Sequence, residues 1–332
     1  MSGQRHRRQE IESRDALIAA LGAGTVAGHV LQAVDVSGVN ALATADVRNT
    51  VFLGCTFSGV DQERALEDRG ATVFHPLDGV PFKVWRRDLY SVDELLEGYK
   101  QRGYVSTRDF QIYAHYDRER RHPQGAALRE LLAQRLHDLS IDDALHEALA
   151  DSENSGIVGI MGGHGTPRTA ASYRQAAATA WHLTRAGCLV VTGGGPGTME
   201  AGNLGAWLGC YSDLGVLDAA LEVMGAAATF SGGAEEGTSE YLAAIDAYFA
   251  TAKKVVERFG AGVDAETAAR FGRDQDAPGK SLAIPTWFYG HEPTNLFANQ
   301  VAKYFSNALR EDGLLAIATG GVVFAPGSAG TL

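Results

Sequence analysis

Four of the five residues at 193–197 are glycine, and they lie between a short apolar stretch and a stretch that suits a helix. The apolar stretch, 188–191, has the length of a buried strand in a parallel sheet. Glycine accepts positive φ angles and lets a ligand approach the backbone closely. The first N–H groups of the helix that begins at Thr198 attract an anion. The pattern predicts a phosphate-binding turn, although such a turn can also serve only as a tight chain reversal.

Two further glycine turns follow predicted strands. The stretch 157–161 predicts a strand that leads into a glycine turn at 162–165. The apolar stretch 321–325 predicts a buried strand that leads into PGSAGT at 326–331. Backbone N–H groups with a hydroxyl at a helix N-terminus would again suit an anion. Because the chain stops at Leu332, before the helix that should follow, we expect it to be a truncated part of a longer protein.

Several side chains near these turns allow two interpretations each. Glu200 either contributes to binding or compensates the dipole of the helix whose first turn it occupies. His164 either contacts the ligand or caps the next helix. Asn295 either recognises a base or caps a helix, and Glu292 is a further candidate carboxylate three residues before it.

Composition limits the classes of function. The chain has 332 residues, enough for two domains, and a net charge of −11, which disfavours nonspecific nucleic-acid binding. Its three cysteines form no CxxC pair and fit a reducing cytoplasm. No apolar run is long enough to span a membrane. The histidines have no metal-ligand spacing. We therefore expect a cytoplasmic protein with no metal, no cofactor, no nucleic-acid partner and no membrane segment.

The order of predicted elements indicates an α/β fold. A strand at 50–56, a helix at 61–69 and a strand at 71–75 predict a small α/β accessory domain over 1–150. Residues 107–150 are expected to be helical, with breaks near 122–123 and at Ser140. A polar segment at 151–156 marks the domain boundary. In the second domain, 151–332, a helix is expected to begin at 291–295 and to continue through Arg310.

At this point the sequence resembles a known family. The glycine turn after the strand at 157–161, Tyr173 in the next helix, TGGGPGTMEAGNLGA at 192–206 and PGSAGT at 326–331 look like the LOG family. The HEPTN stretch at 291–295 resembles the larger bacterial nucleotide 5′-monophosphate nucleosidases of the same superfamily. The resemblance covers 157–332. It implies a Rossmann-like, doubly wound parallel sheet with helices on both faces.

The resemblance also implies an activity, namely hydrolysis of a nucleoside 5′-monophosphate to free base and ribose 5-phosphate. In the family, the last glycine turn binds the 5′-phosphate, an arginine that matches Arg310 holds the substrate, and a glutamate shortly after this turn is the key carboxylate. That glutamate is expected beyond Leu332. Here Ser328 replaces the second glycine of the family's PGG. The residues expected to bind substrate are Gly162, His164, Gly193, Gly194, Gly195, Gly197, Thr198, Met199, Glu200, Glu292, Asn295, Gly327, Ser328, Gly330 and Thr331.

Three functions follow from these observations. The first is the phosphoribohydrolase just described, acting on a small-molecule nucleoside monophosphate as a homo-oligomer. The second is a non-catalytic nucleotide sensor on the same fold, which Ser328 and the missing carboxylate favour. The third, a dinucleotide-dependent oxidoreductase, ranks last because GGGPG is not the GxGxxG pattern and no acidic residue follows at the expected distance.

Overall fold

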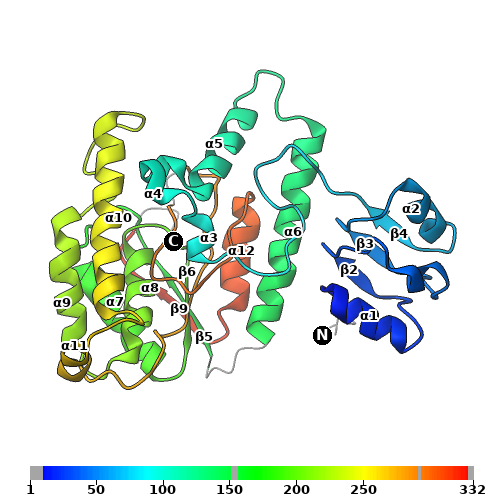
Figure 1. Ribbon diagram of the computed structural model, residues 1–332. Coiled ribbons are helices and arrows are strands. Elements are labelled where there is room, and N and C mark those ends of the chain that lie inside the picture. Colours follow the sequence, from blue (N-terminus) through cyan, green and yellow to red (C-terminus); the bar gives the residue numbers. More distant parts are fainter. Residues whose placement is uncertain (1–9, 151–155, 291–292, 328–332) are drawn as a thin grey trace. The chain divides into compact units, whose positions relative to one another are not determined.

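The computed structural model describes residues 10–150, 156–290 and 293–327 (Figure 1). Contacts divide the chain into two units, of which the first holds residues 1–88 and 124–147 and the second holds residues 89–123 and 148–332. This division groups 89–123 with the second unit. The domain boundary at 150–151 stays a prediction. Among the described residues, no helix is both long enough and apolar enough to cross a membrane.

The first unit contains a four-stranded, all-parallel sheet in the order β1-β2-β3-β4. Each strand pairs with the strand that lies 20 or 21 residues further along the chain. This regular spacing indicates an internal repeat of 20 or 21 residues. Each repeat contains one strand and the connection that leads to the start of the next strand. The elements are β1 (Glu10–Ile11), α1 (Arg14–Gly22), β2 (Val30–Gln32), η1 (Asn40–Ala43), β3 (Val51–Leu53), α2 (Val60–Glu67) and β4 (Thr72–Phe74).

The repeat stacks equivalent side chains along one face of this sheet. Ile11 pairs with Leu31, Leu31 with Phe52, and Phe52 with Val73; the first three belong to one buried apolar cluster, and the partly buried Val73 packs against it. Helix α6 (Leu128–Ala150) runs without the break that we expected at Ser140. That prediction is wrong because the Ser140 hydroxyl donates to backbone carbonyl groups, including that of Leu136 one turn earlier, and so does not cap a new helix.

The second unit contains a five-stranded, all-parallel sheet in the order β8-β7-β6-β5-β9. Its first strand along the chain, β5, lies between β6 and β9, so the strand order reverses at β5. The strands are β5 (Ile157–Met161), β6 (Leu189–Thr192), β7 (Ser281–Ala283), β8 (Gln300–Val301) and β9 (Gly321–Phe324).

Helices cover both faces of this sheet. On β5, the face of Ile160 packs against Gly202 of α8, and the opposite face, at Gly159, packs against Leu314 of α12. The two all-parallel sheets with their helices confirm a mixed α/β protein. The helices are α3 (Val92–Leu95), α4 (Tyr99–Arg102), η2 (Tyr104–Ser106), α5 (Arg108–Arg120), α7 (Ala171–Arg185), α8 (Thr198–Trp207), η3 (Leu208–Cys210), α9 (Gly215–Met224), η4 (Gly225–Ala227), α10 (Ser239–Phe259), α11 (Ala265–Arg270) and α12 (Asn307–Ile317).

Two predictions for the last forty residues are wrong. The helix expected to begin at 291–295, of which 291–292 lie outside the described residues, begins only at Asn307, where the Ser306 side chain caps α12. Before it, Val301 pairs with Ala283 as part of β8, because this segment completes the sheet beside β7. The strand expected to be buried, β9, pairs only with β5 among the described residues, and Phe324 is 55% exposed.

Candidate functional site

Three turns meet at the carboxyl edge of the second sheet. The turn after β5 contacts the turn after β9 through a hydrogen bond from the Gly163 N–H to the Pro326 carbonyl, 3.3 Å long. The carbonyl oxygen of Gly163 accepts a 3.1 Å hydrogen bond from the N–H of Thr198, at the start of α8. A side chain at Gly197 would lie 2.5 Å from the Gly163 carbonyl oxygen, so glycine is required there for the close approach.

The Thr198 N–H is thus used within the protein, and a backbone hydrogen bond from Gly197 reaches the Tyr248 hydroxyl. In the part of the chain that the structure describes, no backbone–backbone hydrogen bond of the turns uses the Gly195 N–H. The Thr198 hydroxyl lies 3.1 Å from that of Thr166, and a Cβ at Gly162 would collide with the Thr198 side chain. The first two turns are therefore packed together tightly around the N-terminus of α8.

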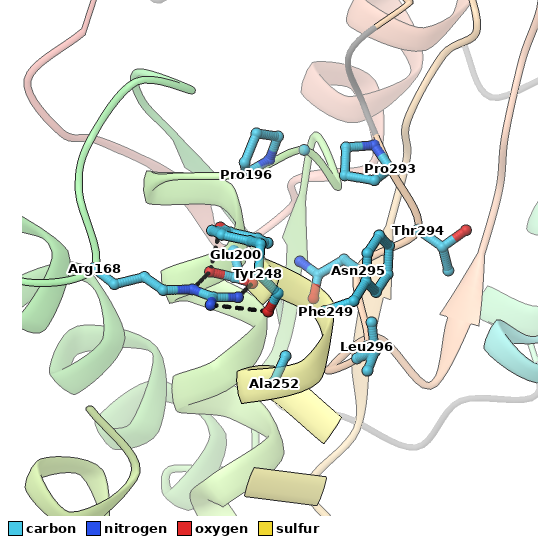
Figure 2. Close-up of a pocket in the computed structure, with 11 residues that line it drawn as sticks. Arg168, Pro196, Glu200, Tyr248, Phe249, Ala252, Pro293, Thr294, Asn295 and Leu296 are labelled. Atoms are coloured by element: carbon cyan, nitrogen blue, oxygen red, sulfur yellow. Dashed lines mark hydrogen bonds and ion pairs between the residues drawn. The ribbon is translucent and has the colours of Figure 1, made fainter. Parts of the chain in front are cut away.

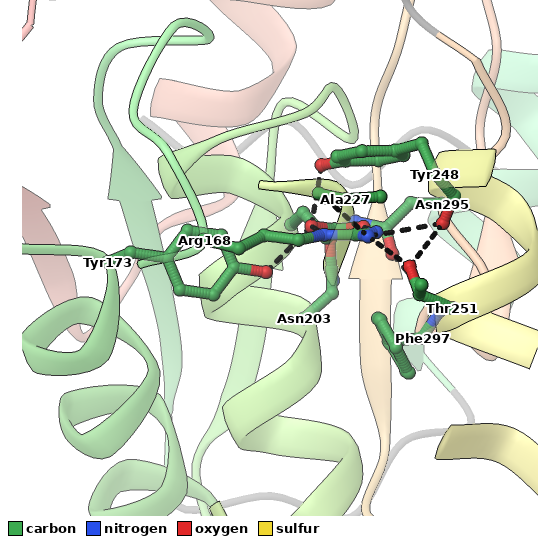
Figure 3. Close-up of polar contacts among 9 residues, drawn as sticks. Arg168, Tyr173, Asn203, Ala227, Tyr248, Thr251, Asn295 and Phe297 are labelled. Atoms are coloured by element: carbon green, nitrogen blue, oxygen red, sulfur yellow. Dashed lines mark hydrogen bonds and ion pairs between the residues drawn. The ribbon is translucent and has the colours of Figure 1, made fainter. Parts of the chain in front are cut away.

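Glu200, on the first turn of α8, is held in a buried polar network (Figure 3). Its Oε1 lies 2.5 Å from Nη2 of Arg168. Its Oε2 accepts hydrogen bonds from Arg168 Nε at 2.8 Å, from the Tyr173 hydroxyl at 2.7 Å and from the Tyr248 hydroxyl at 2.6 Å. Both carboxylate oxygens are therefore occupied by donors from within the protein.

Arg168 is equally committed. Its Nη1 donates to the Ala227 and Tyr248 carbonyl oxygens and to the Thr251 hydroxyl, and its guanidinium lies 3.3 Å from the centre of the Tyr248 ring. Together with the pair to Glu200, these bonds use the donors on all three guanidinium nitrogens. Arg168 therefore joins α8 to α10 and is not directed at a ligand.

The surroundings fix the protonation of this network. Burial, with the Glu200 charge acting in the same direction, raises the pKa of Tyr173 and Tyr248 well above the usual tyrosine value. Burial, the largest single influence, would lower the pKa of Arg168, but the charge of Glu200, the hydrogen bonds to it and the two neighbouring phenols together raise the pKa. Both phenols therefore remain protonated donors, and the guanidinium remains charged.

Arg310, on α12, reaches the same edge of the sheet from the opposite face. Its Nε donates to the Ile284 carbonyl at 3.0 Å, and its Nη2 donates to the Gly193 carbonyl at 3.3 Å. Nη2 also lies 4.0 Å from the sulfur of Met199. Arg310 as a whole is 9% exposed. The structure thus brings a positive charge against the glycine turn that follows β6.

A second polar network fixes Asn295. Its Nδ2 donates to Oδ1 of Asn203 at 2.9 Å, and its Oδ1 accepts from the Phe297 N–H. The Asn203 oxygen also accepts a 2.6 Å bond from the Thr192 hydroxyl, which in turn accepts from the Gly194 N–H. Asn295 therefore does not cap a helix. It couples the segment that begins at Pro293 to the glycine turn.

A small pocket lies between these two networks (Figure 2). Pro196 and Pro293 face each other across it, with Glu200 and Tyr248 on one side and Asn295 on another. Its free volume is about 10 Å³, which is room for roughly one water molecule.

The remaining predicted residues divide into two groups. His164 is exposed, and its two interpretations stay open. Gly327 is also exposed, and a Cβ placed on Gly163 would lie 3.4 Å from its Cα. Four predicted residues lie outside the described part of the chain, namely Glu292, Ser328, Gly330 and Thr331.

Some residues of the networks had no role in the predictions. Asn203 lies three positions after Glu200 on α8, so helical spacing could have placed the two side chains near one face. Tyr248 and Thr251 carry no such signal. They follow Glu200 by about fifty residues, and only the packing of α10 brings them to Arg168.

Fold and site together define a parallel α/β protein with glycine turns gathered where the strand order reverses. Comparisons of the chain with protein-family models and with curated proteins find no match.

Proposed function

We propose that the second unit has a Rossmann-like, doubly wound fold, binds a nucleoside 5′-monophosphate and hydrolyses its N-glycosidic bond. The observation that supports this most is the contact between the turns after β5, β6 and β9, around Gly163. In open parallel sheets, ligands bind outside the carboxyl ends of the strands at the point where the strand order reverses. In this sheet that point is β5.

The donors at this edge suit a phosphate group. The N–H group of Gly195 precedes the N-terminus of α8, and Arg310 adds a positive charge on the other side of the turn. The family resemblance adds Gly330 and Thr331 as further phosphate ligands. A net charge of −11 does not oppose this, since a few local donors are sufficient for one small anion.

Cleavage of an N-glycosidic bond builds positive charge on the ribose, so a carboxylate near the reacting carbon is required. Glu200 lines the pocket, but Arg168 and the two phenols already occupy its oxygens. By the resemblance, the reacting carboxylate would instead follow the motif at 326–331. The occupied state of Glu200 favours the second candidate function, a nucleotide-binding protein without catalysis.

The test is to incubate the purified protein with AMP, GMP, CMP, UMP and IMP and to measure free base by chromatography and binding by calorimetry. We expect base release, and Arg310→Met should weaken nucleotide binding by about tenfold or more because a charged donor is lost. Arg174→Ala is the matched control, since Arg174 pairs with Asp218 at an exposed position. Binding without base release supports the second candidate. Absence of both overturns the two together.

A further inference from the structure

One buried carboxylate joins three segments at the carboxyl edge of the second sheet. Asp109, on the first turn of α5, is 1% exposed. Its Oδ1 accepts a 2.9 Å hydrogen bond from Trp287 Nε1 and lies 2.7 Å from Lys303 Nζ. Its Oδ2 accepts a 3.0 Å bond from the Thr294 hydroxyl. Lys303 is also 1% exposed, so the pair is fully removed from water.

The three partners come from different parts of the sheet. Trp287 follows β7, Lys303 follows β8, and Thr294 belongs to the segment between these strands. Thr294 and Asn295 form one wall of the small pocket (Figure 2). The Asp109 carboxylate therefore fixes this wall from outside and does not itself line the pocket.

Residues 104–109, which include Asp109, also support the opposite wall of the pocket, formed by α10. Tyr104, on η2, stacks on Phe249 of α10 with ring centres 5.3 Å apart and planes inclined by 23°. Its backbone N–H donates to the Asp246 carboxylate, also on α10, at 3.0 Å. Phe249 lines the pocket. Residues 104–109 thus contact both α10 and the segment that begins at Pro293.

We infer that Asp109 is a positioning residue for the pocket. Through Thr294, the Asp109 carboxylate holds the 293–297 segment at a fixed distance from α10. A buried ion pair gains little stability over apolar packing, but its hydrogen bonds have strict geometry, which suits this role. The identity of the ligand rests on the proposed function, whereas the positioning itself does not. Asp109 and Thr294 affect nucleotide binding by ordering Asn295 and its hydrogen bond from the Phe297 N–H.

Two readouts test this inference on the full chain. The first is hydrogen exchange of residues 293–298 without ligand, followed at the Phe297 amide. The second is the affinity for AMP by calorimetry. Asp109→Asn should accelerate exchange in this segment by about tenfold and weaken AMP binding by a similar factor, the change that loss of one such hydrogen bond produces. Thr294→Val, which keeps the Asp109–Lys303 pair, should act in the same direction.

Controls separate positioning from general loss of stability. Thr294→Ser retains a hydroxyl and should restore slow exchange. Leu314→Ala removes a buried side chain of α12, on the other face of the sheet, and should lower the unfolding temperature while leaving exchange at 293–298 unchanged.

Each outcome decides the inference. If Asp109→Asn does not fold, Thr294→Val against Thr294→Ser carries the test. If the unaltered protein binds no nucleotide, the proposed function fails, and exchange at 293–298 still supports or overturns the positioning role. Unchanged exchange in both variants, or unchanged AMP affinity in a protein that binds AMP, overturns it.

Discussion

At the scale of single residues, the second unit removes several charges from water and then compensates each of them. Glu200 faces one guanidinium and two phenols, and Asp109 faces an ammonium group, an indole N–H and the hydroxyls of Thr294 and Tyr104. Such groups are costly when one partner is lost, because the remaining charge stays buried. The polar residues of the site therefore contribute to stability as well as to the proposed binding.

Glu200→Gln tests this compensation. The substitution keeps the size of the side chain but leaves the buried Arg168 guanidinium without its carboxylate, so we expect a loss of about 3–5 kcal/mol in the free energy of unfolding. The control is Asp218→Asn, which breaks an exposed pair with Arg174 and should cost at most about 1 kcal/mol. Urea unfolding at pH 7 measures both. Equal losses in the two variants would contradict the buried compensation.

The buried phenols predict a loss of stability at alkaline pH. The pKa of Tyr173 and Tyr248 is raised in the folded protein, so above about pH 10 the unfolded chain loses protons that the folded protein keeps. Their contribution is complete below that pH and falls by about 1.4 kcal/mol per pH unit for each tyrosine as pH rises further. In urea unfolding between pH 8 and 11, Tyr173→Phe should show a shallower alkaline decline. An unchanged slope would exclude Tyr173 from this linkage.

At the scale of elements, the turns are specified more strictly than the strands that precede them. Gly197 has a φ of 70° and a ψ of −130°, and two carbonyl oxygens of the neighbouring turn lie where a Cβ would be. The backbone conformation requires glycine at position 197, and the close contact between the turns requires it as well.

Gly197→Ala should lower the free energy of unfolding by at least about 1–3 kcal/mol for the backbone conformation alone. Gly313→Ala is the matched control, because a Cβ at that position of α12 meets no atom within 4 Å. There alanine should stabilise the helix by up to about 1 kcal/mol. Thermal unfolding distinguishes the two variants, and a harmless Gly197→Ala would mean that the turns are not in close contact in solution.

Predictability from sequence follows the range of the interactions. The strands β5 and β6 have a local pattern of apolar residues, and their positions agree with the expectations, as does the start of α8 at Thr198. Residues 295–306 have apolar and aromatic side chains compatible with a helix, but Gln300 and Val301 pair with β7, and this pairing depends on distant residues. The repeat in the first unit was missed because its strands are only two or three residues long.

The candidate site shows the same limit. The glycine turns were predicted because clustered glycines allow positive φ angles and close approach of the backbone, whatever the rest of the fold. The partners of Glu200 and Asp109 could not be predicted, since Tyr248 and Lys303 reach them only through tertiary packing.

At the scale of the whole molecule, the contact division makes a prediction about fragments. A fragment of residues 151–332 lacks Asp109 and so loses the ion pair between Asp109 and Lys303, and it also lacks Tyr104 against Phe249. A fragment of residues 89–332 keeps both. We expect the longer fragment to unfold cooperatively at a clearly higher temperature, as measured by circular dichroism. Equal midpoints would show that 89–123 is not part of the folded second unit.

The pairing of β5 with β9 also affects how the protein emerges from the ribosome. Val158 of β5 pairs with Val190 of β6, which is synthesised soon after it. Val158 also pairs with Gly321 of β9, which is synthesised much later. At roughly 5–20 residues per second, the second partner of β5 is completed about 8–30 seconds after β5 itself. Throughout this interval one edge of the nascent sheet has exposed backbone groups that can pair with another chain. Chaperone access during translation is therefore expected to matter more for the second unit than for the first, whose strands find their partners within about twenty residues.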